Sequence, residues 1–210
     1  DNTSPEWYSR KRIAIIGGIG PESTVYYYQR IIWAFKSIGD GFTYPEIIIY
    51  SADLSALTQM VHAGQWDRIT EWLLARVTAL HAAGAEFGAI GSNTPHAVFD
   101  QVQSRSPIPL LSIVAATCRQ ARRLGLRHLG LMGTQFTMES NFYQNAFLRH
   151  GMAMVVPDAA DRERIQHRLF TEIELGIIRE STRQEMLEKK KKTIDTHAID
   201  GLILGCTELP

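Results

Sequence analysis

The 210-residue chain is 45% hydrophobic and 21% charged, and its 22 basic side chains balance its 22 acidic ones. This composition is typical of a soluble globular protein of one or two domains. A neutral chain lacks the basic excess that attracts nucleic acid or an anionic membrane, so we expect a small-molecule partner. No apolar run approaches the roughly 18 residues of a membrane span. The two cysteines form neither a disulfide framework nor a zinc pattern, so we expect a cytoplasmic protein.

Seven short apolar runs predict β-strands along the chain. Apolar residues follow one another in these runs without alternation, as in parallel strands that are covered on both faces. The runs cover residues 12–18, 46–51, 87–92, 109–113, 128–133, 152–157 and 201–206.

Amphipathic stretches between these runs predict helices, and residues 1–11 read as a tail. The alternation of strand and helix predicts an α/β fold with parallel sheets and right-handed crossovers. The predicted helices cover residues 22–37, 66–83, 114–124, 137–150 and 160–196, the last of them broken near Gly176.

An internal repeat suggests a duplicated α/β unit. RIAIIGGIGPEST at 12–24 resembles HLGLMGTQFTMES at 128–140, since in both an apolar strand, a glycine and a turn lead to Glu-Ser. GAEFGAIGSNTPH at 84–96 resembles AIDGLILGCTELP at 198–210 in the same manner, and the two pairs have nearly equal offsets.

The repeat predicts two pseudo-symmetric domains, residues 1–112 and 113–210. It also pairs Ser92 with Cys206 at matching strand ends. Ligands of open α/β sheets bind beyond the carboxyl ends of the strands, so we expect both residues to face one cleft between the domains.

The two cysteines lie in different contexts. Cys206 follows GLILG and precedes polar residues, so a turn could lower its pKa and make it a base or a nucleophile. The alternative is a small hydrophobe that ends a buried strand. Cys118 lies within a helical pattern among apolar neighbours and is expected in the core.

Polar residues follow the strand ends in both halves. Ser92, Asn93 and Thr94 either cap the next helix or present donors to a substrate carboxylate, and one geometry can serve both roles. Thr134 and Thr137 occupy the equivalent place in the second half and are equally good turn residues.

The glycine-rich loop GGIGPEST gives little support for nucleotide binding. Gly18 and Gly20 fit the first two positions of the dinucleotide fingerprint, but Ser23 stands at the third. The chain also has no Walker lysine and no G-x-S-x-G elbow.

Several of these stretches together resemble the aspartate/glutamate racemase family of cofactor-independent amino-acid racemases. They are IAIIGGIGPESTVYYYQRI, IIIYSADL, GSNTPH, LGLMGTQFTMESNFY and GLILGCTELP, in the order of the family. The resemblance implies two flavodoxin-like domains, usually in a homodimer, and a catalytic pair that needs neither pyridoxal phosphate nor a metal. Family members usually continue beyond the position of Pro210, so the resemblance also implies a second domain truncated at its end.

The resemblance implies a role for each site residue. Cys206 matches one catalytic cysteine, and Ser92 stands where the other is expected. The substrate carboxylate would meet the hydroxyl and amide donors, and an acidic side chain would meet Arg164. The implied substrate-binding residues are Asn93, Thr94, Thr134, Thr137, Arg164 and Thr207.

The serine at position 92 leaves several functions open. A hydroxyl is a far weaker acid than a thiol and does not rest as an anion at neutral pH without an adjacent base. Ser92 could be an engineered exchange, or a natural residue that works beside Cys206 through a proton shuttle. A one-thiol decarboxylase of malonate-like acids and a non-catalytic carboxylate-binding protein are the alternatives to an aspartate- or glutamate-specific racemase.

Overall fold

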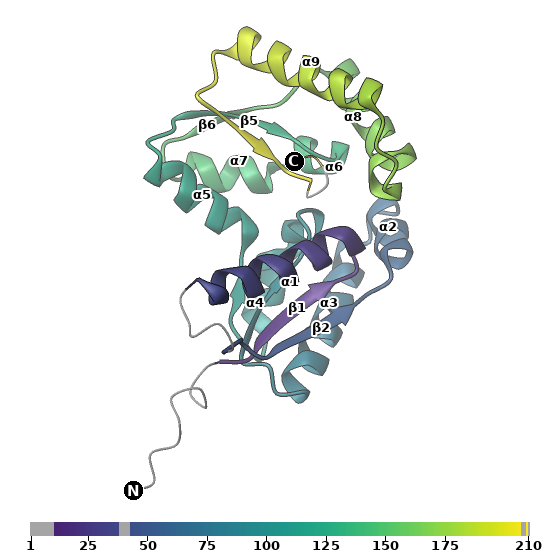
Figure 1. Ribbon diagram of the computed structural model, residues 1–210, viewed down its shortest axis with the longest axis vertical. Coiled ribbons are helices and arrows are strands. Elements are labelled where there is room, and N and C mark those ends of the chain that lie inside the picture. The colour runs from purple at the N-terminus through teal and green to yellow at the C-terminus, as the bar shows by residue number, and fades with distance from the viewer. Residues whose placement is uncertain (1–10, 38–42, 207–208, 210) are drawn as a thin grey trace, which may run out of the picture. The chain divides into compact units, whose positions relative to one another are not determined.

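The computed structural model describes residues 11–37, 43–206 and 209. The chain forms two compact units, Asp1–Ser112 and Ile113–Pro210, here called unit 1 and unit 2. Each unit has its own parallel sheet with helices packed against it (Figure 1). The predicted α/β fold with parallel sheets is therefore confirmed.

Unit 1 is built on a parallel sheet of four strands in the order β2-β1-β3-β4. The central strand β1 pairs with both neighbours, and Ile15 lies opposite Ile49 on one side and Ala89 on the other. The strands are β1 (Ile13–Gly17), β2 (Ile47–Ser51), β3 (Phe87–Ile90) and β4 (Leu110–Leu111).

Helices cover both faces of this sheet, with α1 in front of it and α3 behind it in Figure 1. The buried residues of α3, among them Ile69, Leu73 and Val77, pack with Ala14 and Ile16 of β1 in one hydrophobic cluster. The helical elements of unit 1 are α1 (Pro21–Lys36), α2 (Leu54–His62), α3 (Trp66–Ala82), the 3₁₀ helix η2 (Thr94–Val98) and α4 (Phe99–Arg105).

Unit 2 repeats the arrangement with a parallel sheet in the order β6-β5-β7. The central strand β5 is flanked by the next strand along the chain and by a later one, as β1 is in unit 1. The strands are β5 (His128–Met132), β6 (Ala153–Val155) and β7 (Gly201–Leu204).

The two faces of the unit 2 sheet carry separate hydrophobic clusters. Leu129 and Leu131 pack with α5 and α7, whereas Met132 packs with α6 and α8. In Figure 1, α8 and α9 run along one side of the sheet and α5 and α7 along the other. The helical elements are α5 (Ile113–Arg123), α6 (Gln135–Glu139), α7 (Asn141–Leu148), α8 (Ala159–Thr171), the 3₁₀ helix η3 (Ile173–Leu175) and α9 (Glu180–His197).

The helices differ from the prediction in three places. The helix predicted over 137–150 is interrupted at Ser140, whose backbone is extended and whose hydroxyl donates to the Phe136 carbonyl. Two helices, α2 and α4, were not predicted. The predicted break near Gly176 is confirmed, because this glycine adopts φ +69° directly after η3.

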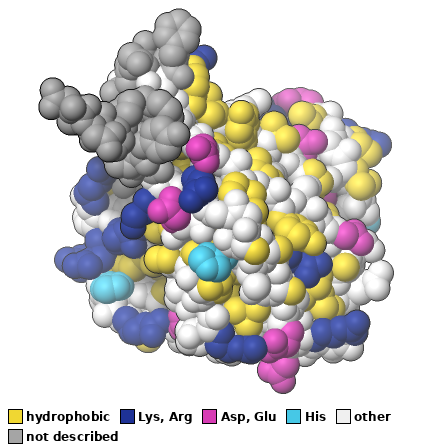
Figure 2. Space-filling view, turned by 90° about the horizontal axis from the view of Figure 1, so that it is seen from below, with side chains coloured by type: hydrophobic (Ala, Val, Ile, Leu, Met, Phe, Trp, Pro, Cys, Tyr) yellow, Lys and Arg dark blue, Asp and Glu magenta, His cyan; other side chains and the backbone are white. Residues whose placement is uncertain are grey.

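The surface agrees with the balanced composition. Figure 2 shows a face on which basic, acidic and hydrophobic side chains all reach the surface. Among the described residues, no helix has the length and apolar character that a membrane crossing requires.

Candidate functional site

In unit 1, the predicted site residue Ser92 follows directly on the end of β3. Gly91 connects β3 to Ser92, and its N–H donates to the Ile16 carbonyl at 2.9 Å. Ser92 is half-buried and Asn93 is buried. The sequence prediction of polar residues at this strand end is therefore reproduced in the fold.

The turn after Ser92 is not the helix cap that the residue types suggest. Asn93 stands at the N-cap of η2, but its side chain makes no capping hydrogen bond and its backbone is already helical. Pro95 lies in the first turn, as expected, and α4 begins only at Phe99. The turn is held by the backbone, since the His96 N–H donates to the Asn93 carbonyl at 2.9 Å.

His96 fixes the same turn from inside the unit. Its Nδ1 lies 2.8 Å from the Ser92 carbonyl, which makes Nδ1 the donor, and its ring stacks on Phe99 with centroids 5.1 Å apart. Burial lowers the pKa of His96 to about 4, so the ring is neutral at physiological pH. His96 therefore orients the main chain at Ser92 and carries no charge.

Two residues of α1 that the sequence did not mark as site residues lie beside this strand end. The buried Ser23 hydroxyl donates to the Gly20 carbonyl at 2.8 Å and lies 3.4 Å from the Gly91 carbonyl. Tyr27 passes close to Gly91, and burial raises the pKa of its phenol, which stays protonated. The internal repeat places Ser23 after the first strand, in the Glu-Ser pair, but it does not mark Ser23 or Tyr27 as a site residue.

The glycine-rich loop serves the packing of this end of the unit. The Gly18 N–H donates to the Thr24 hydroxyl at 2.8 Å. Gly18 has φ +80°, and a Cβ there would lie 2.2 Å from the Ala52 carbonyl oxygen. The loop needs glycine at these positions because of its contacts. The packing of the unit therefore accounts for the glycine-rich sequence without a bound nucleotide.

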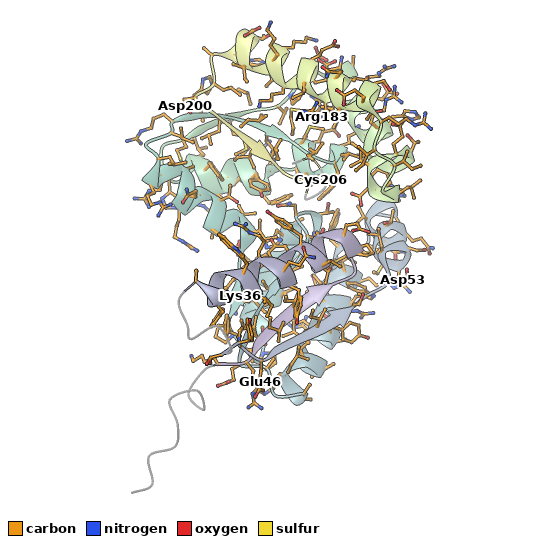
Figure 3. The ribbon with its side chains drawn as sticks, viewed as in Figure 1. Lys36, Glu46, Asp53, Arg183, Asp200 and Cys206 are labelled. Atoms are coloured by element: carbon orange, nitrogen blue, oxygen red, sulfur yellow. The ribbon has the colours of Figure 1, made fainter. Side chains whose placement is uncertain are left out.

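In unit 2, Cys206 lies just past the end of β7 (Figure 3). The side chain is buried, with 6% of the residue exposed, and its Sγ donates a hydrogen bond to Oε1 of Glu174 at 3.3 Å. Glu174 belongs to η3 and was not a predicted site residue. The thiol thus lies beside a carboxylate at the strand end where the sequence predicts acid/base chemistry.

The two predicted threonines of unit 2 lie at the end of β5. Thr134 is the N-cap of α6, and its Oγ1 accepts from the Thr137 N–H at 3.2 Å and donates to Thr137 Oγ1 at 2.9 Å. Thr137 is fully buried. Thr134 therefore serves the turn into α6, in keeping with the expectation of a turn residue, and the pair lies at the strand end next to that of Cys206.

Arg164 lies on α8, where its guanidinium pairs with Glu185 of α9 at 2.8 Å. Its side chain is 61% exposed. A substrate carboxylate at Arg164 would have to compete with Glu185. Thr207, the remaining predicted binding residue, lies outside the described residues.

The other reactive side chains that the structure describes give little support for a second functional site. Cys118 is buried on α5, and burial raises the pKa of its thiol, as expected for a core cysteine. In the part of the chain that the structure describes, no three His, Cys, Asp or Glu side chains gather as a metal site requires.

Comparison with known sequences links these features to one group of enzymes. A family model described as Asp/Glu/Hydantoin racemase matches residues 16–210. The broad specificity amino-acid racemase RacX of Bacillus subtilis (strain 168) is 24% identical over 200 residues, which cover 94% of this chain and 85% of RacX.

Solved structures share the fold over almost the whole chain. A Yersinia pestis protein provisionally described as an Asp/Glu racemase has a TM-score of 0.86 and 35% identity, over 95% of this chain and 86% of its own. An aspartate racemase homologue from Pyrococcus horikoshii OT3 has a TM-score of 0.80 and 36% identity, over 95% of this chain and 87% of its own.

Proposed function

Because the chain belongs to the Asp/Glu/Hydantoin racemase family, we propose that it is a cofactor-independent amino-acid racemase that acts on aspartate or glutamate. The observation that carries the proposal is the buried Cys206 thiol at the end of β7, hydrogen-bonded to a carboxylate. Ser92 stands at the corresponding strand end of unit 1. These two residues are the proposed acid/base pair.

The proposed reaction moves one proton off the substrate α-carbon and one proton onto it. A thiolate at Cys206 takes the proton on one face, so the Cα–H bond breaks and an S–H bond forms. The electron pair stays on the α-carbon as a carbanion. The Ser92 hydroxyl, or a water that it holds, then gives up its O–H proton to form the new Cα–H bond on the opposite face. Exchange with solvent returns a proton to this oxygen and removes the proton gained by Cys206.

Neutralising the substrate carboxylate is the main means of stabilising this carbanion. Hydrogen-bond donors aimed at developing charge, in a site that excludes water, contribute more than the same donors in solvent. We assign this role to the backbone and side-chain donors at the ends of β3 and β5. They are Asn93, Thr94, Thr134 and Thr137, and we assign the same role to Thr207, the residue that follows Cys206 in the sequence.

Arg164 is the proposed partner of the acidic side chain of the substrate. The Arg164→Met variant should raise KM for aspartate and glutamate about tenfold and leave KM for a neutral amino acid unchanged, because only the dicarboxylates would use the guanidinium. Arg183→Met is the matched control, since Arg183 also pairs with a carboxylate on the surface of unit 2, that of Glu180. Equal KM values for the two variants would remove Arg164 from the site.

Two further properties are proposed from family membership. We propose that the enzyme works in the cytoplasm, in keeping with its two free thiols. We also propose a homodimer, which light scattering of the full chain would test directly; a monomer mass at micromolar concentration would contradict it.

A one-thiol lyase is the second candidate, and the serine at position 92 favours it. Cys118 is a core residue, so Cys206 is left as the one thiol at a strand end of the described chain. A single thiol can protonate a carbanion that forms when a malonate-like acid loses carbon dioxide. Release of carbon dioxide from such an acid, without racemisation of amino acids, would favour this function.

Exchange of the α-proton with deuterated solvent tests the leading proposal. The chain and its Ser92→Cys variant are screened side by side against L-aspartate, L-glutamate and neutral amino acids. We expect exchange with the dicarboxylates and a gain of about 100-fold in the variant, because a thiol is the stronger acid. Absence of exchange with every amino acid in both forms would refute racemisation, and binding of a dicarboxylate in that case would identify a non-catalytic carboxylate-binding protein.

A further inference from the structure

Helix α1 carries an apolar stripe on the side turned away from its sheet. Val25, Tyr26 and Trp33 are 52%, 58% and 61% exposed, and the partly buried Ile32 lies on the same side. Val25 and Ile32 are seven residues apart, as are Tyr26 and Trp33, a spacing that keeps all four on one helix face. An exposed patch of large apolar side chains marks an interaction surface in a soluble protein.

The opposite side of α1 is the one that packs in unit 1. Its principal contact there is with β1, and its buried residues are Ser23 and Thr24. Among the described residues, the hydrophobic cluster of unit 1 draws on α2, α3 and α4 but takes no member from α1. The core of unit 1 therefore does not use the apolar stripe.

The stripe is ordered and hollowed in a way that suits a partner. The Arg30 guanidinium lies 5.9 Å from the ring centroid of Tyr26 and 4.9 Å from that of Trp33. Rings that are held in place lose little freedom when a partner covers them. A hollow of about 400 Å³ beside Trp33 gives a side chain room to enter. Its described lining residues are Tyr28, Gln29, Arg30, Ile32, Trp33 and Lys36.

The two ends of the stripe carry opposite charges. Glu22 lies in the first turn of α1 and Lys36 in the last (Figure 3), and both are exposed. Gln29 lies midway on the same face, seven residues from each. An antiparallel copy of the helix that is centred on Gln29 therefore brings Glu22 of each copy opposite Lys36 of the other.

The same arrangement covers the apolar residues. Val25 of each copy lies opposite Trp33 of the other, and Tyr26 lies opposite Ile32. A parallel arrangement would instead place like charges together at both ends of the stripe. A single polar residue in an apolar seam fixes the register of a helix pair, and Gln29 stands where it can do so.

We propose that the outer face of α1 is the surface on which a second copy of this chain docks, with the two α1 helices antiparallel about Gln29. The surface is complementary to itself in both charge and apolar residues, and a twofold pair covers both stripes at once. At 1.5 Å per residue, the 16 residues of α1 give a seam about 24 Å long. The inference names the surface of the homodimer proposed above, and it does not depend on racemisation.

The mass of the full chain, measured against concentration by analytical ultracentrifugation, tests the surface. We expect a dimer that Trp33→Ala weakens about 100-fold, because large aromatic side chains dominate interface energies and each dimer loses two of them. Leu124→Ala is the matched control, since Leu124 of unit 2 is also 61% exposed, and it should leave the dissociation constant unchanged.

Charge reversal tests the antiparallel register. Glu22→Lys and Lys36→Glu each place like charges at both ends of their own pair, so each variant alone should dimerise about tenfold more weakly at low salt. In an equimolar mixture of the two variants, opposite charges face each other at both ends again. The mixture should therefore form a heterodimer with the affinity of the parent chain.

The possible results separate the proposals from one another. A chain that stays monomeric at about 100 μM, where a micromolar dimer would be almost fully formed, would overturn the docking surface. A dimer that Trp33→Ala leaves intact would retain the homodimer and remove α1 from its interface. A mixture no tighter than its components would refute the antiparallel register. Solvent exchange is measured separately, so a monomer that exchanges α-protons refutes the dimer alone, and a dimer without exchange refutes racemisation alone.

Discussion

In unit 1 Ser92 lies two residues past the end of β3, and in unit 2 Cys206 lies two residues past the end of β7, and both strands occupy the same place beside the central strand of their sheet. The two strand ends also have different neighbours. The Ser92 carbonyl accepts a hydrogen bond from a neutral histidine, while the Cys206 thiol donates one to a carboxylate. The same topology therefore places different groups at the two strand ends.

The contrast is the basis for a division of roles between the units, which we propose. Unit 1 offers a hydroxyl, an amide and a turn of backbone at its strand end, all of them groups that suit recognition of a carboxylate. Unit 2 offers a thiol in an apolar cluster beside a carboxylate, which suits movement of a proton. Variants that make the two ends more alike test this division.

The largest effect is expected from Cys206→Ser, which gives both strand ends a hydroxyl. The exchange of substrate α-protons should fall by about 100- to 10,000-fold, because the hydroxyl is too weak an acid to supply the anion that abstracts the proton. The exchange rate is measured by NMR in deuterated solvent.

Cys118→Ala is the control for this experiment, because it removes the other thiol from the core of unit 2. It should lower the melting temperature and leave exchange per folded molecule unchanged. Full exchange in Cys206→Ser would mean that the two strand ends do not differ in the way proposed.

The second prediction concerns acid stability, which should differ between the units because of His96. The pKa of His96 is about 4 in the folded chain and about 6.5 in the unfolded chain, so between these values the unfolded chain binds more protons. Stability is therefore unaffected by His96 above about pH 6.5 and falls as the pH drops towards 4. Between pH 7 and pH 5 the free energy of unfolding of unit 1 should fall by about 2 kcal/mol.

Tryptophan fluorescence during urea unfolding measures this change in unit 1 alone. All four tryptophans, Trp7, Trp33, Trp66 and Trp72, lie in residues 1–112. The His96→Gln variant should lose most of the dependence between pH 7 and pH 5, although other groups also titrate there. An equal pH dependence in the variant would show that His96 is not the buried base.

The central strands of both units could be predicted from the sequence because each is buried on two faces. In IAIIG of β1 and HLGLM of β5, consecutive apolar residues pack on opposite faces of the sheet, which leaves a continuous run in the sequence. The seven predicted strands are all present, and each is shorter than predicted. The helix boundaries were harder, because Ser140 ends α6 with a side-chain hydrogen bond that periodicity does not record.

The candidate site was predictable only where it follows the strands. Ser92, Cys206 and Thr134 are marked by their place after an apolar run and a glycine. Glu174 and Ser23 are not, because each reaches its strand end through the folding of a distant segment. Contacts of this kind depend on how η3 and α1 pack, and no local pattern in the sequence specifies that packing.

The last comparison concerns the glycines that precede the two site residues, one of which is expected to tolerate a methyl group with almost no effect. Neither Gly91 nor Gly205 has a positive φ, so a methyl group at either position is judged by its contacts alone. At Gly205 a Cβ would lie 2.9 Å from Cδ1 of the fully buried Leu131 and 3.2 Å from the Met132 carbonyl oxygen. Gly205→Ala should therefore destabilise unit 2 by about 1–3 kcal/mol, as overpacking in a core does.

Gly91→Ala is the matched variant in unit 1. Its nearest contact would be the Ile16 carbonyl oxygen at 3.3 Å, and the next atoms lie at 3.8 Å and beyond. A shift of a few tenths of an ångström relieves that contact, and the lost flexibility of the unfolded chain stabilises the variant by about 0.4–1 kcal/mol. Chemical unfolding monitored by circular dichroism should thus find Gly91→Ala nearly neutral and Gly205→Ala clearly destabilised. Equal losses would mean that the strand end of unit 1 is packed as tightly as that of unit 2, and that the two ends differ in chemistry alone.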